Sequence, residues 1–205
     1  MSVRIRPLER KDCATVARLH NQYISVGTLN TLGDNFTELI FQTLVGYPAG
    51  FCLIAEDNGR IVGFVAGTAN IQKFYHEFFR RYPLQAAFYL SKQIFNLDML
   101  KKMFRLARYP FKPTDLPDAE GLSFVVIPEY RIKGLAILLL QHKVAAFKAI
   151  GVEHVRIGIH ASLTKNQKFF EQIGAELKSE LHWSDQDKIK LYMWDLSTFK
   201  LNVSV

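Results

Sequence analysis

The chain has 205 residues, a length typical of one domain, and 49% of them are hydrophobic, enough for a core of ordinary size. Its charged fraction of 22% and aromatic fraction of 13% are not those of a disordered chain. No apolar run approaches the ~18 residues that a membrane-spanning helix needs, and the first residues lack the apolar stretch of a signal peptide, so we expect a cytoplasmic protein.

The first third of the chain carries clear strand and helix patterns. Alternating apolar residues predict strands, and apolar residues spaced three and four apart predict helices. The dipeptide Asn58-Gly59 suits the positive φ angles of a tight hairpin turn. In chain order, these patterns predict a strand, two helices and a β-hairpin at 3–8, 12–24, 35–46 and 51–69.

Residues 70–118 have a distinct composition. Two helical patterns are separated by Pro83, and three later prolines predict an irregular connection. The chain has 26 Lys and Arg against 19 Asp and Glu, a net charge of +7 that arises between residues 73 and 112, because the rest of the chain is neutral. Between residues 73 and 112 the segment combines eleven aromatic residues with nine basic ones: Lys73, Arg80, Arg81, Lys92, Lys101, Lys102, Arg105, Arg108 and Lys112.

The second half of the chain alternates between strands and helices. Gly151 and Gly174 are well placed to end the two helices in a left-handed conformation. The patterns predict a strand, a long helix, a strand, a short helix and a final pair of strands at 122–127, 134–150, 154–160, 164–174 and 181–196. A hairpin together with a strand–helix–strand crossover argues for a mixed α/β sheet.

The two cysteines, Cys13 and Cys52, have neither a C-x-x-C partner nor metal-type spacing. We expect buried free thiols in a reducing compartment rather than a disulfide. The six histidines include no pair four residues apart, so the sequence predicts no metal site.

The stretch VVIPEYRIKGLAILLL, residues 125–140, joins a strand to a long helix. A helix that starts there presents free backbone N–H groups and the positive end of its dipole, which suits a phosphate. Gly134 allows close approach, Arg131 and Lys133 add positive charge, and the small Ala136 keeps the first turn open. A plain turn with solvated charges is the alternative. Neither a P-loop nor a G-x-G-x-x-G motif occurs, so ATP or dinucleotide binding is not supported.

Residues 131–136, Arg-Ile-Lys-Gly-Leu-Ala, resemble the acetyl-CoA loop of the GNAT N-acetyltransferase family, [RQ]-x-x-G-x-[GA]. The preceding residues 126–130 are similar to the family's usual lead-in, and the order of strands and helices matches over most of the chain. The resemblance implies one domain over 1–205, with a mixed, mostly antiparallel central sheet flanked by helices. The main departure is a basic aromatic helical insert at about 70–118, between the third and fourth strands.

The resemblance implies acetyl-CoA as acyl donor and assigns residues to its parts. The usual position of a polar contact on the other side of the cofactor holds Leu163, so later residues of that helix are the candidates. The backbone of the central strand would contact the pantetheine arm, at Phe124, Val125 and Val126. The backbone of the loop would hold the pyrophosphate, at Arg131, Ile132, Lys133, Gly134, Leu135 and Ala136. The side chains of Asn166 and Lys168 would add polar contacts.

The implied reaction moves the acetyl group to a primary amine by direct attack in a ternary complex, so a base must take the proton of the amine. Glu120, eleven residues before the loop, is the base candidate, with a solvated strand-start carboxylate as the alternative. Asp118 is a second candidate for the base. His160 is a third, although it shares its strand with His154 and Arg156, and this pattern favours an exposed strand face for all three residues.

The family often uses a tyrosine of the last helix as the acid, and here that position holds Phe170, which has no proton to give. Ser162 is a weak candidate for the acid, and solvent is another. A non-catalytic module that binds CoA or a protein partner is therefore the main alternative to an enzyme.

The basic aromatic insert leaves three interpretations open. It can form an extra helical subdomain or dimer contact, a lid over the acceptor site, or a surface that contacts a membrane or a nucleic acid. No nucleic-acid-binding signature accompanies it, so we expect no nucleic acid. The expected partners are a small-molecule or peptide amine and a second copy of the chain in a homodimer.

Overall fold

The computed structural model describes residues 3–24, 29, 32–91, 116–182 and 188–199. Within these ranges the strands form a seven-stranded sheet in the order β1-β2-β3-β4-β5-β7-β6, in which only β4 and β5 run parallel. The strands are β1 (Arg4–Pro7), β2 (Gly50–Asp57), β3 (Arg60–Thr68), β4 (Glu120–Val126), β5 (His154–His160), β6 (Ala175–His182) and β7 (Lys188–Asp195).

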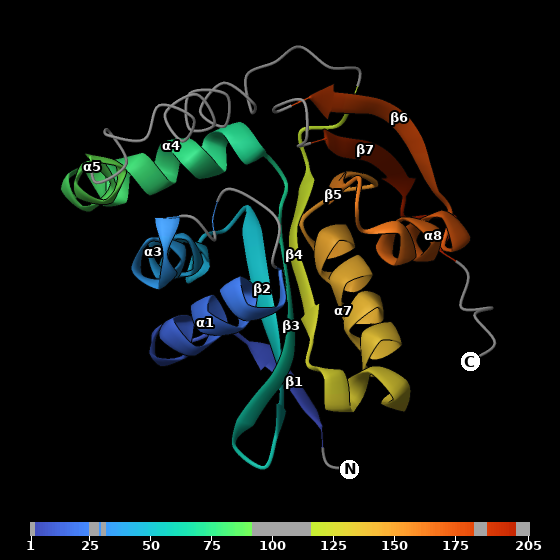
Figure 1. The fold of residues 1–205 in the computed structure, drawn as a ribbon, viewed down its shortest axis with the longest axis horizontal. Coiled ribbons are helices and arrows are strands. Elements are labelled where there is room, and N and C mark those ends of the chain that lie inside the picture. Colours follow the sequence, from blue (N-terminus) through green and yellow to red (C-terminus); the bar gives the residue numbers. More distant parts are fainter. Residues whose placement is uncertain (1–2, 25–28, 30–31, 92–115, 183–187, 200–205) are drawn as a thin grey trace.

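Helices cover both faces of the sheet (Figure 1). Helices α1, α3, α4 and α5 lie on one side, and α7 and α8 lie on the other. A short 3-10 helix η1 precedes α1, and η3 connects β4 to α7. The helices are η1 (Arg10–Asp12), α1 (Cys13–Tyr23), α3 (Asp34–Leu44), α4 (Ile71–Arg81), α5 (Pro83–Ser91), η3 (Pro128–Lys133), α7 (Leu135–Ala149) and α8 (Thr164–Gln172).

The predicted mixed, mostly antiparallel sheet is confirmed, and local turn chemistry explains several element ends. Asn58 has φ 49° and Gly59 has φ 78°, as the hairpin between β2 and β3 requires. Gly151 has φ 76° directly after α7. The final pair of strands begins earlier than predicted, because β6 already starts at Ala175.

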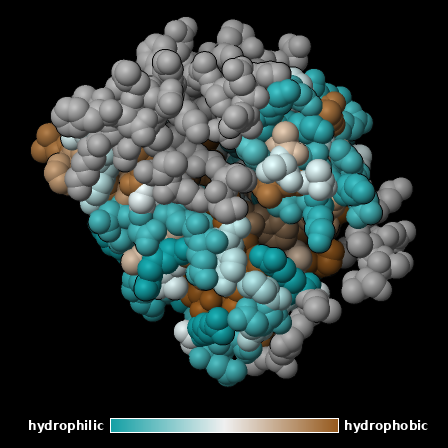
Figure 2. Space-filling view, in the orientation of Figure 1, coloured by the Kyte–Doolittle hydropathy of each residue, from teal (hydrophilic) through white to brown (hydrophobic). Residues whose placement is uncertain are grey.

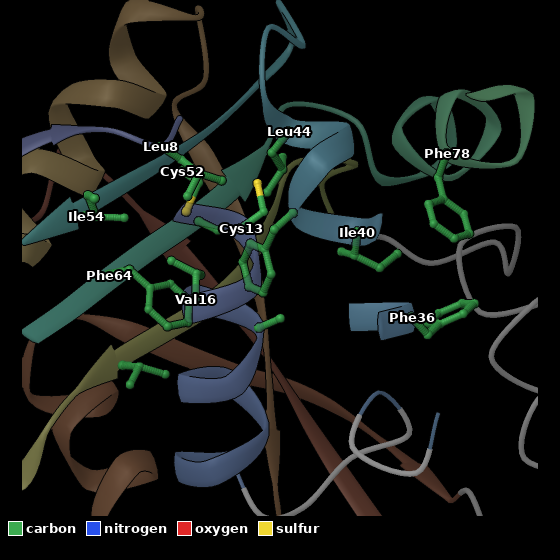
Figure 3. Close-up of a cluster of buried hydrophobic side chains, with 14 of the residues drawn as sticks. Leu8, Cys13, Val16, Phe36, Ile40, Leu44, Cys52, Ile54, Phe64 and Phe78 are labelled. Carbon is green, nitrogen blue, oxygen red and sulfur yellow. The ribbon is translucent and has the colours of Figure 1, made fainter. Parts of the chain in front are cut away.

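The core between the sheet and α1, α3 and α4 contains both cysteines (Figure 3). Cys13 and Cys52 are buried and free, which confirms the predicted thiols. Phe41 and Phe64 meet edge to face, with ring centroids 5.4 Å apart. Contacts of this kind between α3 and β3 fix the helical layer on the sheet.

Helices α4 and α5 fill the first part of the segment between β3 and β4. Phe74 and Phe78 of α4 are fully buried, so these aromatic side chains pack inward rather than against a ligand. Leu84 is 81% exposed and Phe88 56%, and Figure 2 shows apolar atoms at its left edge, where α5 lies in Figure 1. The rest of the segment, 92–115, lies outside the described residues, so its roles as lid, dimer contact or binding surface stay predictions.

The described ranges contain neither a membrane-spanning helix nor a cluster of metal-ligating side chains. No helix there is both long and apolar enough to cross a membrane. No group of three or more His, Cys, Asp or Glu side chains among these residues is arranged to hold a metal ion.

Candidate functional site

Strands β4 and β5 separate after a short paired start. Their register has one pair, Glu120 with Arg156, and the backbone N–H of Arg156 donates to the carbonyl of Ala119 at 2.8 Å. Beyond this point β4 keeps its ladder with β3 only. Its backbone groups that face β5 are therefore free to bind an extended ligand.

A cavity of about 570 Å³ occupies the space where the two strands part. Residues of β4 and β5 line it, together with residues of α1, η3, α7 and α8. Figure 2 shows apolar atoms between hydrophilic surfaces near the middle of the picture. The polar and charged side chains that line this cavity include His20, Tyr23, Lys143, His160, Lys165 and Asn166.

The loop between β4 and α7 opens onto this cavity with bare backbone. Gly134 caps α7 in the left-handed conformation, φ 73°, and no side chain caps the helix. The backbone N–H of Leu138 donates to the Gly134 carbonyl at 3.1 Å, which is the first hydrogen bond of the helix. A Cβ atom added at Gly134 would meet nothing within 4 Å. The N–H groups of the first turn of α7 have no helical acceptor and Gly134 adds no side chain beside them, which suits an anion.

Arg131 holds the loop to the end of β4. Its Nε donates to the Val126 carbonyl at 3.0 Å, and its guanidinium carbon lies 6.0 Å from the ring centroid of Tyr23 in α1. Arg131 and Ala136 both line the cavity. The side chains of Ile132 and Lys133 lie outside the part of the chain that the structure describes, so their place in the site stays a prediction.

The sequence prediction of an exposed Arg156 is wrong, since this residue is 2% exposed. Its Nε and Nη2 lie 3.0 Å and 2.9 Å from Oε2 of Glu120. Alternation along β5 predicted the exposed face, but the neighbouring strand supplies a carboxylate that compensates the buried charge. Glu120 itself sits at the paired start of the strands and is not among the residues that line the cavity.

Replacing Arg156 by methionine should lower the free energy of unfolding by about 3–5 kcal/mol, because the Glu120 carboxylate would stay largely buried without its counter-charge. Its side chain is 14% exposed. Lys178→Met breaks the solvent-exposed pair with Glu176 and is the matched control, with an expected change below about 0.5 kcal/mol. Urea denaturation measures both, and equal small losses would contradict the structural role of Arg156.

The other predicted polar residues divide between the cavity and its surroundings. His160 lines the cavity, and its Nδ1 lies 2.7 Å from Oγ of Ser162, which is exposed and outside the lining. Asn166 lines the cavity whereas Lys168 does not. Asp118 accepts a hydrogen bond at 3.0 Å from the side chain of the asparagine that caps α4.

The model of the Acetyltransferase (GNAT) family matches residues 17–175, more than half of the chain. The chain belongs to this family. It is therefore an acyltransferase, as the loop at residues 131–136 predicted. A search of curated proteins found no match.

Solved structures of GNAT acetyltransferases share the fold. One is yncA, a putative acetyltransferase from Salmonella typhimurium with its cofactor acetyl-CoA, at 14% identity and TM-score 0.61, covering 96% of this chain and 95% of that one. An N-acetyltransferase from Staphylococcus aureus Mu50 is 18% identical, with a TM-score of 0.61, and the match covers 96% of this chain and 99% of that one. Arabidopsis thaliana NAA60 in complex with a bisubstrate analogue is 15% identical, with a TM-score of 0.59, and the match covers 95% of this chain and 98% of that one.

In this GNAT protein, sequence reasoning missed two cavity residues that are almost completely buried, His20 in α1 and Lys143 in α7. Lys143 had a weak signal, since it lies at helical spacing with the apolar residues Leu139, Leu140 and Phe147 of α7. His20 had none, because a histidine on the apolar face of a helix is common in cores. Phe170, at the family's tyrosine position, is buried against Trp194, with ring centroids 6.5 Å apart.

His20 is held in a defined orientation at the cavity. Its Nδ1 lies 3.1 Å from Oδ1 of Asn21, which also accepts a hydrogen bond from Oγ of Thr37 at 3.2 Å. The Asn21 amide nitrogen donates to Oδ1 of Asp34 at 2.8 Å. Burial lowers the pKa of His20, so the imidazole is neutral near pH 7 and able to accept a proton.

Proposed function

We propose that this GNAT protein binds acetyl-CoA in the cavity between β4 and β5 and transfers the acetyl group directly to a primary amine in a ternary complex. The observation that carries the proposal is the open backbone at Gly134, at the start of α7 and next to the cavity. Family membership supports the same reaction class.

The site fits the parts of acetyl-CoA in order along β4. The N–H groups of the first turn of α7 suit the pyrophosphate, and the unpaired backbone edge of β4 suits the polar groups of the pantetheine arm. Phe124, Val125 and Val126 line the cavity along this edge, and Asn166 lines it from α8. Lys165, rather than Lys168, supplies the positive charge on that side.

Glu120 is the proposed base for the attacking amine. The Arg156 guanidinium orients its carboxylate at the point where β4 and β5 separate. Since Glu120 does not line the cavity, the proton would reach it through a water molecule. His20 is the second candidate, because its neutral imidazole faces the cavity from α1 and needs no such relay.

The acceptor is proposed to be a small molecule or peptide that enters from the side of α1. His20 and Tyr23 line the cavity there, whereas Phe170 closes the opposite side within the core. A homodimer and a cytoplasmic location stay predictions. The non-catalytic alternative predicts that CoA binds without turnover over a panel of amines.

A thermal-shift series tests the donor. Acetyl-CoA at about 100 times its dissociation constant should stabilise the protein by roughly 2.7 kcal/mol, which corresponds to a rise in Tm of about 5–10 °C for a chain of this size. ATP and NAD at the same concentration should give much smaller shifts. No stabilisation by millimolar acetyl-CoA would remove the proposal.

A further inference from the structure

Lys143 is a buried cation beside the cavity. It comes from the middle of α7, is 1% exposed, and lines the cavity between the two separating strands. A Cβ atom added at Gly121 of β4 would lie 2.7 Å from its Nζ, so a side chain there would shift the end of the lysine, and the glycine leaves that space to the ammonium group. Burial of an ammonium group without a counter-charge is costly.

No carboxylate of the described residues forms an ion pair with Lys143. Its nearest aromatic neighbour is Phe170, whose ring centroid lies 6.0 Å from Nζ. The carboxylate at the start of β4, Glu120, is bound to Arg156 instead. The other titratable groups that face the cavity, from α1, η3, β5 and α8, are His20, Tyr23, Arg131, His160 and Lys165.

The position of Lys143 coincides with a missing function. Phe170 occupies the place where the family often has a proton-donating tyrosine, and it has no proton to give. Lys143 brings a proton donor to the same ring from the neighbouring helix α7. The other candidate for the acid, Ser162, lies outside the cavity.

We propose that Lys143 is the catalytic acid of this acetyltransferase, which stabilises the departing CoA thiolate and protonates it. This inference rests on the proposed function, since it requires acetyl-CoA in the cavity. Gly121 is its positioning partner, because the absence of a side chain there leaves the space that the ammonium group occupies.

The step is balanced without any further reactant. The acceptor nitrogen forms a bond to the thioester carbonyl carbon, the C–S bond breaks, and its electron pair stays on sulfur. Lys143 Nζ gives one proton to this sulfur, and the base takes one proton from the new amide nitrogen. Exchange with solvent returns a proton from the base to Lys143.

The electrostatics of the site support this role. Burial lowers the pKa of Lys143 to about 8, so its ammonium form persists near pH 7 but gives up its proton more readily than an exposed lysine. The rate should therefore fall as pH rises through about 8. Because the folded-state pKa lies below that of the unfolded chain, the burial cost is fully present at low pH and is relieved as pH rises above about 8.

The first test measures the thiol pKa of bound CoA from the ultraviolet absorbance of its thiolate. In the wild type this pKa should be at least one unit lower than in Lys143→Met, because the ammonium group stabilises the thiolate. If CoA binds both proteins but its thiol pKa is the same, the inference is wrong. If CoA binds neither the wild type nor the variant, the proposed function itself fails.

The second test compares turnover and stability. Lys143→Met should lower kcat by about 10²-fold, lose the decline in rate above pH 8, and raise Tm because the buried charge is gone. Lys148→Met, an exposed lysine on the same helix, is the control and should change none of these. Lys143→Arg should keep part of the effect on the CoA thiol. An unchanged kcat and pH profile in Lys143→Met, or an acetyl group found on Lys143 by mass spectrometry, would overturn the proposal.

Discussion

Replacing Gly134 by valine should raise the dissociation constant of acetyl-CoA by about 100-fold, which corresponds to the loss of roughly two charge-assisted hydrogen bonds from backbone to phosphate. The new side chain would fill the space that is open above Gly134. It would also strain the loop, because a β-branched residue disfavours a φ of 73°. Isothermal titration with acetyl-CoA measures the loss.

The other end of the same helix offers a matched control. Gly151 follows α7 with φ 76°, and a Cβ atom there would also meet nothing within 4 Å. Gly151→Val thus introduces the same backbone strain far from the loop and should cost similar stability while leaving acetyl-CoA affinity intact. Equal loss of affinity in Gly134→Val and Gly151→Val would mean that strain in α7, and not the open backbone, decides binding.

These two glycines also show what the sequence predicts well. The left-handed Gly151 at the end of α7, and the paired positive φ angles of the hairpin turn, follow from local chemistry that needs no knowledge of distant contacts, whereas the left-handed conformation of Gly134 was not predicted. The element order and the loop at residues 131–136 were predictable for the same reason. Both depend on patterns within about fifteen consecutive residues.

The chemistry inside the cavity depends instead on contacts between residues far apart in the chain. Alternation along β5 predicted an exposed Arg156, whereas a carboxylate 36 residues earlier in the chain allows it to be buried. Lys143 Nζ occupies the space that a side chain at Gly121 of β4 would enter, and no pattern within α7 indicates this neighbour. His20 faces the cavity because α1 packs over β4, which no pattern within α1 could indicate.

The second prediction with a large expected effect concerns the proposed base, Glu120. Glu120→Gln should lower kcat by about 10²–10³-fold, because a neutral amide accepts no proton. It should also remove the fall in rate at acidic pH that protonation of the base causes. The variant keeps the size of the side chain and one acceptor oxygen for the Arg156 guanidinium, but it removes the counter-charge of this buried residue, so it should also be less stable. Its folding is checked by Tm, and rates are compared below the melting transition of both proteins.

Asp118→Asn is the matched control, since this carboxylate lies two residues before Glu120 and is held by the capping asparagine of α4. It should leave kcat and the pH profile unchanged. If Glu120→Gln also leaves both unchanged, Glu120 is not the base, and its ion pair with Arg156 is structural. His20→Gln then becomes the deciding variant, because His20 is the neutral imidazole that already faces the cavity from the acceptor side. If only His20→Gln loses the fall in rate at acidic pH, the base is His20 of α1 and not Glu120 of β4. The proton acceptor, His20, and the proposed proton donor, Lys143, would then both line the same cavity.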